Sequence, residues 1–345
     1  MMNLPRTRYY GSKRKLVEKI WTVLNDYHIE YNSILDLFGG SGMVSYYMAA
    51  KGKEVIYNDI MQFNCKIATA LLQSPKGVLS EEMAENLLKK RQGIEYLHYI
   101  ENLYKDIYYH DIENSLIDIA VQNIQLLPLQ AQASAYYVLF QSCMIKRPFN
   151  IFHRKNLSLR TNYTTAQFGN KKTWETPFNE LFVRFTKELY QFQFSQLPNT
   201  RIENQSALNL NVQADMVYID TPYFSQNGTP ISYHNRYHFL EGLVHYFDIP
   251  DHINNAKVNK ELDFGDCAEF ENKTTYINNL HLLLELHKES IIALSYTSNG
   301  YPSVKELTRI VKQHKQNVQC FDLGRHPFAL NRDNNERHEV LIVGR

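Results

Sequence analysis

Cysteine, tryptophan and net charge are all scarce in this sequence. Its four cysteines are far apart and form no C-x-x-C pair, so neither a zinc site nor a disulfide framework is expected. Such cysteine usage fits a reducing cytosol. The 37 basic and 36 acidic residues nearly cancel, which leaves a formal net charge of +1. A neutral total does not exclude a polyanionic partner, because it can hide a one-sided basic patch.

Long apolar runs are missing as well. No stretch approaches the roughly 18 apolar residues of a membrane span. The N-terminus, MMNLPRTRYYGSKRK, is basic but lacks the apolar core of a signal peptide. We therefore expect a cytoplasmic protein without a membrane partner.

Several familiar catalytic and nucleotide-binding motifs are also absent. The sequence has no G-x-x-x-x-G-K-S/T loop, no G-x-G-x-x-G fingerprint, no H-E-x-x-H pair and no nucleophile elbow. His234 and His238 are four residues apart, a spacing that places two imidazoles on one helical face. Without an accompanying H-E-x-x-H we expect a structural or substrate-contacting role for them, and no metal cofactor.

What is present is an alternation of strand and helix patterns at both ends of the chain. Residues 33–38 predict a buried strand, followed by a glycine turn, a helix and a second strand at 54–60. A β-α-β unit of this kind implies a parallel sheet with a right-handed crossover. After residue 200 the same rhythm returns, and the chain closes with a predicted strand pair at 317–323 and 339–345.

Residues 76–190 differ, because they show helical periodicity without clear parallel-strand signals. Between 146 and 190 there are nine basic residues and three acidic ones, interleaved with aromatic side chains such as Phe149 and Trp174. This composition is typical of a nucleic-acid surface, although a solvated loop would also explain it. The candidate contacts with phosphates are Lys146, Arg147, Arg154, Lys155, Arg160, Lys171 and Lys172.

The glycine turn DLFGGSG, residues 36–42, indicates a cofactor site at the end of the first strand. Glycines there let the backbone approach a ligand closely. Asp59 follows Asp36 by 23 residues and ends the next predicted strand, where an acid can bind the two hydroxyls of a ribose. The turn is not a phosphate-binding loop, so an adenosine cofactor without phosphates fits, and S-adenosylmethionine is such a molecule. The alternative is a plain tight turn.

The stretch VYIDTPYF, residues 217–224, places an acid where another strand ends. In open α/β sheets, ligands bind beyond the carboxyl ends of the strands. We expect a planar base to stack on Tyr223 while its exocyclic amine donates hydrogen bonds to Asp220 and to the Thr221 carbonyl, with Pro222 fixing the turn. The alternative is a turn that Asp220 merely caps.

Four stretches in the same order resemble motifs of the Dam-like D12 class of DNA adenine-N6 methyltransferases. They are RYYGSK (8–13), DLFGGSG (36–42), YNDI (57–60) and YIDTPY (218–223), and the resemblance covers residues 8–72 and about 200–345. It implies Asp220, Thr221, Pro222 and Tyr223 as catalytic residues. It implies cofactor contacts from Tyr9, Tyr10, Gly11, Lys13, Asp36, Phe38, Gly39, Gly40, Ser41, Gly42, Asp59, Ile60 and Asp220. Thr221 departs from the family pattern, which usually has proline there.

The resemblance also implies an architecture and a function. We expect an α/β, Rossmann-like fold with a mostly parallel seven-stranded sheet, formed by residues 1–75 and 191–345. Residues 76–190 would form a mainly helical insertion that recognises the DNA target. The protein would transfer a methyl group from S-adenosylmethionine to the N6 amine of an adenine flipped out of a specific double-stranded DNA sequence, in the bacterial cytoplasm or nucleoid. A restriction-modification system would supply a cognate endonuclease as a second partner.

Three alternatives remain open at this point. The acceptor could be cytosine N4, an RNA base or a protein amide. A nicotinamide-dependent oxidoreductase could use the same kind of sheet. Thr221 also leaves room for a relative that binds DNA but has weakened catalysis.

Overall fold

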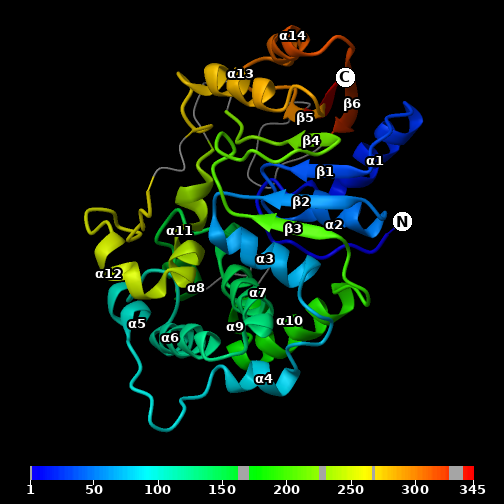
Figure 1. Cartoon of the computed structure of the whole chain (residues 1–345). Helices are drawn as coiled ribbons and strands as arrows, with labels where there is room; N and C mark the ends of the chain where they lie inside the picture. Colours follow the sequence, from blue (N-terminus) through cyan, green and yellow to red (C-terminus); the bar gives the residue numbers. More distant parts are fainter. Residues whose placement is uncertain (1, 162–170, 225–230, 266–268, 326–336) are drawn as a thin grey trace.

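The computed structural model describes residues 2–161, 171–224, 231–265, 269–325 and 337–345. Within these residues, seven strands form one sheet in the order β3-β2-β1-β4-β5-β7-β6 (Figure 1). The strands are β1 (Ser33–Asp36), β2 (Glu54–Asn58), β3 (Thr200–Glu203), β4 (Met216–Ile219), β5 (Ile291–Thr297), β6 (Val318–Arg325) and β7 (His338–Gly344). β7 runs antiparallel to both of its neighbours, β5 and β6, and the other neighbouring pairs of these strands are parallel. The predicted fold class is confirmed.

The sheet is buried on both faces. Ile34 and Leu35 point to opposite faces because side chains alternate along a strand, and neither is exposed. Ile34 packs in the core formed with α1 (Val17–Asp26), α2 (Met43–Ala50) and α3 (Gln62–Leu72). Leu35 packs in the core formed with α13 (Tyr276–Leu286) and α14 (Val304–His314). Helices therefore cover both faces, as a parallel sheet requires.

The order of the strands reverses at β1, which lies between β2 and β4. Asp36 at the end of β1 pairs with Tyr57 of β2 on one side and with Tyr218 of β4 on the other. The carboxyl ends of these three strands are thus level with one another. Such a switch point is where open α/β sheets bind their ligands.

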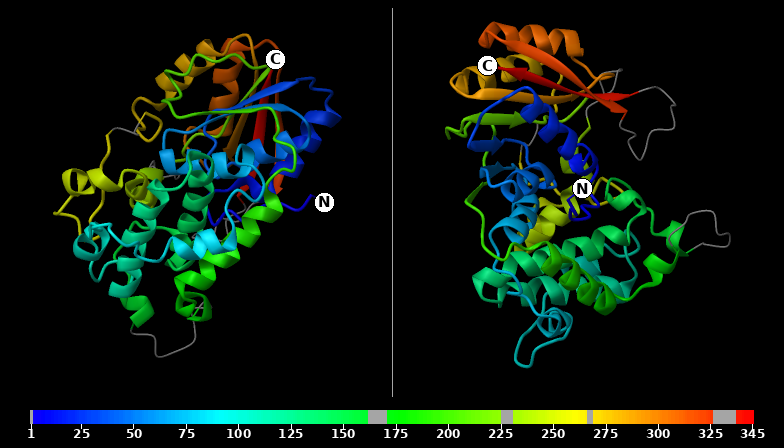
Figure 2. Two further views of the ribbon diagram at one scale, coloured as in Figure 1. Left: turned by 60° about the horizontal axis from the view of Figure 1, so that its bottom comes forward. Right: turned by 90° about the vertical axis from the view of Figure 1, so that its right-hand side faces the viewer.

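The described elements between residues 76 and 190 are all helical, and they gather on the far side of α3 from the sheet (Figures 1 and 2). The longest are α6 (Asp111–Gln125), α7 (Leu129–Ile145) and α10 (Phe178–Phe192). The shorter ones are α4 (Glu81–Asn86), α5 (Tyr99–Leu103), α8 (Ser158–Thr161) and α9 (Lys171–Glu175). Apolar side chains of α4, α5, α6, α7 and α10 join the same core as those of α1, α2 and α3. The division into a catalytic part and an insertion thus stays an interpretation, since the two share one core.

Two further helices follow β4, namely α11 (Tyr233–Val244) and the short α12 (Ile249–His252). In Figure 1, α11 lies near the sheet, whereas α12 lies at the outer edge beside α5. Tyr233 and His234, at the start of α11, line a cavity at the switch point. In the described part of the chain, no helix has both the length and the apolar character needed to cross a membrane.

Candidate functional site

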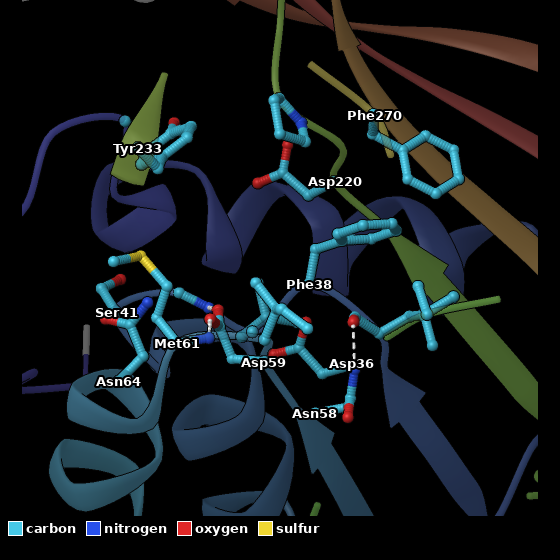
Figure 3. A pocket seen from close by; sticks show the side chains of 18 of the residues that line it. Asp36, Phe38, Ser41, Asn58, Asp59, Met61, Asn64, Asp220, Tyr233 and Phe270 are labelled. Atoms are coloured by element: carbon cyan, nitrogen blue, oxygen red, sulfur yellow. Dashed lines mark hydrogen bonds between the residues drawn. The ribbon is translucent and has the colours of Figure 1, made fainter. Parts of the chain in front are cut away.

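A cavity lies at the switch point, at the carboxyl ends of β1, β2 and β4 (Figure 3). It encloses about 990 Å³ of space, part of it open to solvent. Asp59 and Asp220 lie on opposite sides of it, with Phe38 between them. Of the residues expected to contact a cofactor, those that line it are Tyr9, Gly11, Lys13, Asp36, Phe38, Gly39, Gly40, Ser41, Asp59, Ile60 and Asp220. Gly42 begins α2 beside it.

The glycine turn after β1 can be built only without side chains at its centre. A Cβ atom on Gly39 would lie 2.0 Å from the ring of Tyr57, and Gly40 has a φ of +48°. The Gly39 amide donates a hydrogen bond to the Asn58 carbonyl at 2.8 Å, which ties the turn to the end of β2. The backbone of this turn is therefore exposed to the cavity on its open side.

Two acids behind the turn have different surroundings. Asp59 accepts hydrogen bonds from the amides of Gly40 and Met61, each at 2.8 Å, and lines the cavity. Burial raises its pKa to about 6. Asp36 is more deeply buried and accepts from the Ser45 amide and hydroxyl, and burial raises its pKa to about 7. Asp59 is the better placed of the two to bind a ligand hydroxyl.

The N-terminal segment closes the cavity with an aromatic stack. The ring of Tyr9 lies parallel to those of Tyr237 and Tyr233, at centroid distances of 4.7 and 5.7 Å. The ring of Tyr10 has the Arg236 guanidinium 4.5 Å from its centroid. Of the two tyrosines expected near the cofactor, Tyr9 lines the cavity and Tyr10 packs against Arg236.

Asp220 is held by a network that the motif alone does not predict. Its Oδ1 lies 2.9 Å from the Lys13 ammonium and accepts a hydrogen bond from the Tyr223 hydroxyl at 2.7 Å. Lys13 therefore lines the cavity but directs its charge at Asp220. Burial opposes the charge of Lys13, but Asp220 and Glu339 outweigh burial and raise its pKa above the ordinary value.

The remaining residues of the Asp220 motif are mostly packed inward. The Thr221 hydroxyl is hydrogen-bonded to the Tyr276 hydroxyl at 2.7 Å, which anchors the turn where the family usually has proline. Pro222 lines the cavity. Tyr223 is only 6% exposed, and its ring meets that of Tyr296 edge-on at 5.0 Å. A base could stack on Tyr223 only after this turn moves, so the stacking role stays a prediction.

Three of the predicted phosphate contacts are buried, and the expectation is corrected for them. Lys146 and Arg160 lie 2.7 and 2.8 Å from the Glu113 carboxylate, and their side chains are 2% and 3% exposed. Arg147 is also buried, with its guanidinium 4.3 Å from the ring centroid of Tyr108. These cations stabilise the helical segment, because ionic partners and an aromatic ring replace the water they have lost.

The other predicted contacts fit a surface role. Arg154, Lys155 and Lys172 are exposed, whereas the side chain of Lys171 lies outside the described part. Five residues before Arg154 in the sequence, Phe149 is 56% exposed, and Phe149 and Asn150 have φ values of +60° and +61°. Two successive non-glycine residues with positive φ store backbone strain, and such strain tends to occur in functional segments. The sequence alone did not distinguish Phe149 from the other aromatic residues between 146 and 190.

Sequence reasoning missed one wall of the cavity. It comes from Gln205, Ser206 and Ala207, which follow β3, and from Glu269 and Phe270. The Phe270 ring meets Phe38 edge-on at 5.1 Å, and the Ser206 hydroxyl donates to the Glu269 carboxylate. A strand pattern at 200–203 would have pointed to residues 204–207, since they follow a parallel strand. Nothing in the sequence points to residues 269–271.

Among the described residues, one cluster outside the cavity has metal-ligating side chains. His98, Glu101 and Asp118 place ligand atoms within 4.8 Å of one another. The Asp118 carboxylate, however, accepts from the amides of Ile100 and Glu101 and from the Tyr246 hydroxyl, so it already caps α5. The cluster has a structural explanation, and the expectation of no metal stays a prediction.

Comparison with known proteins is consistent with this geometry. A family model described as D12 class N6 adenine-specific DNA methyltransferase matches residues 9–310. Type II methyltransferase M2.HphI of Haemophilus parahaemolyticus is 24% identical, over 98% of this chain and 96% of its own length. Modification methylase LlaI of Lactococcus lactis subsp. lactis is 26% identical over 83% of this chain, and modification methylase StsI of Streptococcus sanguinis is 26% identical over 89%. The matches cover only 47% and 46% of the latter two proteins.

Proposed function

Because the chain belongs to the D12 class of N6 adenine-specific DNA methyltransferases, we propose that it transfers a methyl group from S-adenosylmethionine to a flipped-out adenine in a specific double-stranded DNA sequence. The observation that carries the proposal is that two carboxylates lie on opposite sides of one cavity. Asp59 can accept the hydroxyls of a ribose, and Asp220 can accept an amine hydrogen on the opposite side. Cofactor and acceptor would thus meet at the switch point of the sheet.

The residues of the cavity fit a cofactor that has no phosphates. Phe38 and Ile60 offer apolar surface for a purine, and the backbone of Gly39 and Gly40 admits the ligand closely. Apart from Lys13 and His234, no basic residue is among the described residues that line the cavity. The charge of Lys13 is directed at Asp220 and not at a ligand phosphate.

The chemistry assigned to this chain is the activation of a poor nucleophile. The N6 lone pair of adenine is delocalised into the purine ring. Asp220 and the Thr221 carbonyl would accept the two amine hydrogens and favour a pyramidal nitrogen, and the negative charge would stabilise the positive charge that develops there. When bound, S-adenosylmethionine supplies the methyl group as an electrophilic sulfonium. Alignment of the two reactants supplies much of the remaining acceleration.

A duplex adenine reaches such a cavity only when it is flipped out, which costs a few kcal/mol. The exposed Arg154, Lys155 and Lys172 would bind phosphates, and the exposed ring of Phe149 would occupy the space left in the stack. The proposed DNA interface thus consists of these exposed residues and does not include the buried Lys146, Arg147 and Arg160. By its relatives' names, the protein would serve a restriction-modification system in the cytoplasm, beside a cognate endonuclease.

We expect Asp59→Ala to weaken S-adenosylmethionine binding about 10- to 100-fold. A hydrogen bond to a charged group contributes about 1.5–3 kcal/mol. Since burial raises the pKa of Asp59 to about 6, affinity in the wild type should also fall as the pH drops below about 6, where the carboxyl is protonated. Calorimetric titration over this pH range measures both effects. Glu54→Ala, at the exposed start of the same strand, is the control. Equal affinity in both variants would place the ribose elsewhere.

We expect the double variant Arg154→Ala/Lys155→Ala to weaken DNA binding on specific and random duplexes alike. Each lost phosphate contact should reduce the slope of log affinity against log salt by roughly 0.9. Binding across a salt series tests this, and Lys89→Ala/Lys90→Ala, two exposed lysines elsewhere in the helical segment, is the matched control. An unaltered slope in the first variant would show that this surface does not face DNA. Loss of discrimination at a single base pair would instead indicate base readout.

Incorporation of labelled methyl groups tests the acceptor. The expected product is N6-methyladenine in duplex DNA at one sequence. Labelling of cytosine, RNA or protein would redirect the proposal to that acceptor. Absence of incorporation with intact DNA binding would favour the catalytically weakened relative that Thr221 suggested.

A further inference from the structure

Glu339, on strand β7, is a buried acid that the proposed function leaves unused. It pairs with Thr297 of β5 and is 1% exposed. It also lies outside residues 9–310, which match the family model. The hydroxyls of Tyr218, Ser295 and Thr297 lie on the same face of the sheet as Glu339, and the Thr297 hydroxyl and Oε1 of Glu339 are buried without a hydrogen-bond partner among the described residues. A buried carboxylate is costly, so its retention calls for a specific partner.

The partners of Glu339 are the groups that hold Asp220. Its Oε2 lies 3.2 Å from the Tyr223 hydroxyl and 3.6 Å from the Lys13 ammonium. The same two groups lie 2.7 and 2.9 Å from Oδ1 of Asp220. Lys13 and Tyr223 are thus shared between two carboxylates, one facing the cavity and one beneath it.

The net charge of this cluster depends on Glu339. Lys13 and Asp220 alone would form a neutral pair, and a neutral pair stabilises positive charge on an acceptor nitrogen only weakly. With ionised Glu339, the cluster carries a net charge of −1 beside the cavity. Because Lys13 and Glu339 are buried and the Asp220 side chain is only 17% exposed, their electrostatic effect on a nearby atom is larger than in water.

We propose that Glu339 is a positioning residue for methyl transfer, which holds Lys13 and the Tyr223 hydroxyl so that Asp220 stays oriented and the cluster stays net negative. The proposal rests on the proposed function. Glu339 does not touch the substrate in this scheme. It acts through Lys13 and Tyr223. Both of these groups contact Oδ1 of Asp220, so Oδ2 would accept the amine hydrogen.

The ionisation of Glu339 makes the proposal measurable. Burial raises the pKa of Glu339 to about 7; the charge of Asp220 adds to this effect, whereas Lys13 opposes it. The titratable groups around it are Lys13, Asp220, Tyr218 and Tyr223. Below this pKa Glu339 is protonated and the cluster is neutral, and above it the cluster is negative. The transfer step should therefore speed up as the pH rises through about 7.

The test is the single-turnover rate of methyl transfer between pH 6 and 8.5, with duplex and S-adenosylmethionine saturating. Glu339→Gln keeps the shape and removes the charge. We expect its rate at pH 8 to be about 10- to 100-fold below wild type, less than for loss of a direct contact. We also expect its rise near pH 7 to disappear. Glu339→Asp should restore part of both. Cofactor affinity and duplex binding should not change.

Ser295→Ala is the control, since it removes a buried hydroxyl on the same face without altering the charge. It should leave rate and pH profile unchanged. A wild-type rate and profile in Glu339→Gln would overturn the proposal. So would an equal loss at every pH together with a lower melting temperature and no rescue by aspartate, because that pattern is structural. A wild-type protein that methylates no duplex adenine would instead refute the proposed function, and the role of Glu339 with it.

Discussion

Replacing Asp220 by alanine should lower the rate of methyl transfer to adenine by about 100- to 1,000-fold, the usual effect of removing one pre-organised electrostatic contact. The variant loses the acceptor for an amine hydrogen. It also leaves the Lys13 ammonium beside the cavity with Glu339 at 3.6 Å as its remaining acidic neighbour. A cation that is less well balanced opposes the positive charge that develops on nitrogen. Single-turnover incorporation of labelled methyl groups at saturating duplex measures this effect.

The control for this variant is Asp215→Ala. Asp215 immediately precedes the same strand, β4, and accepts hydrogen bonds from the amides of Asn32 and Ser33 at the opposite end of the sheet from the cavity. Its loss should affect stability slightly and the transfer rate not at all. Asp220→Asn keeps an acceptor oxygen without the charge, so it separates hydrogen bonding from electrostatics. Near wild-type turnover in Asp220→Ala would refute the catalytic assignment.

Replacing Glu113 by alanine should lower the free energy of unfolding by about 3–5 kcal/mol, because a buried charge pair loses one partner while the other side stays buried. Both carboxylate oxygens of Glu113 accept hydrogen bonds. Lys146 donates to Oε1 at 2.7 Å, and the two terminal nitrogens of Arg160 donate one to each oxygen at 2.8 Å. The variant would leave two cations without a counter-charge. Urea unfolding followed by circular dichroism measures the loss, and the exposed Glu95→Ala should change stability by less than about 0.5 kcal/mol.

The pH dependence of this cluster gives a second readout. Burial alone would raise the pKa of Glu113, but Arg160 and Lys146 outweigh burial and lower it below the ordinary value of 4.5. A lowered carboxyl pKa contributes stability above 4.5 that is lost as the pH falls through the folded-state value. The difference between wild type and Glu113→Ala should therefore shrink in acid. A constant difference at all pH values would show that packing, and not charge, sets the loss.

The same result bears on the basic residues of the helical segment. If Lys146 and Arg160 are structural, their replacement lowers stability without changing the salt dependence of DNA binding. Arg154 and Lys155 should behave in the opposite way. The two classes are not distinguishable by composition, since all four lie within 15 positions of one another in the sequence.

The sequence by itself determined the sheet that carries the site and the acids at its strand ends. The β-α-β unit at 33–60, the strand before Asp220 and the closing strand pair depend on local patterns of apolar, glycine and polar residues. Because the carboxyl ends of parallel strands meet at one edge, motifs at those ends were bound to come together. Asp59 and Asp220 could therefore be placed in one cavity without coordinates.

Only the tertiary structure decided which charges are buried and which partners they have. Arg160 meets Glu113 across 47 positions, and Lys13 meets Glu339 across more than 300, so no local pattern records either pair. The cavity wall at 269–271 and the inward packing of Tyr223 have the same origin. The physical reason is that burial and charge pairing depend on contacts between distant segments, whereas strand, helix and turn preferences depend on neighbours in the chain.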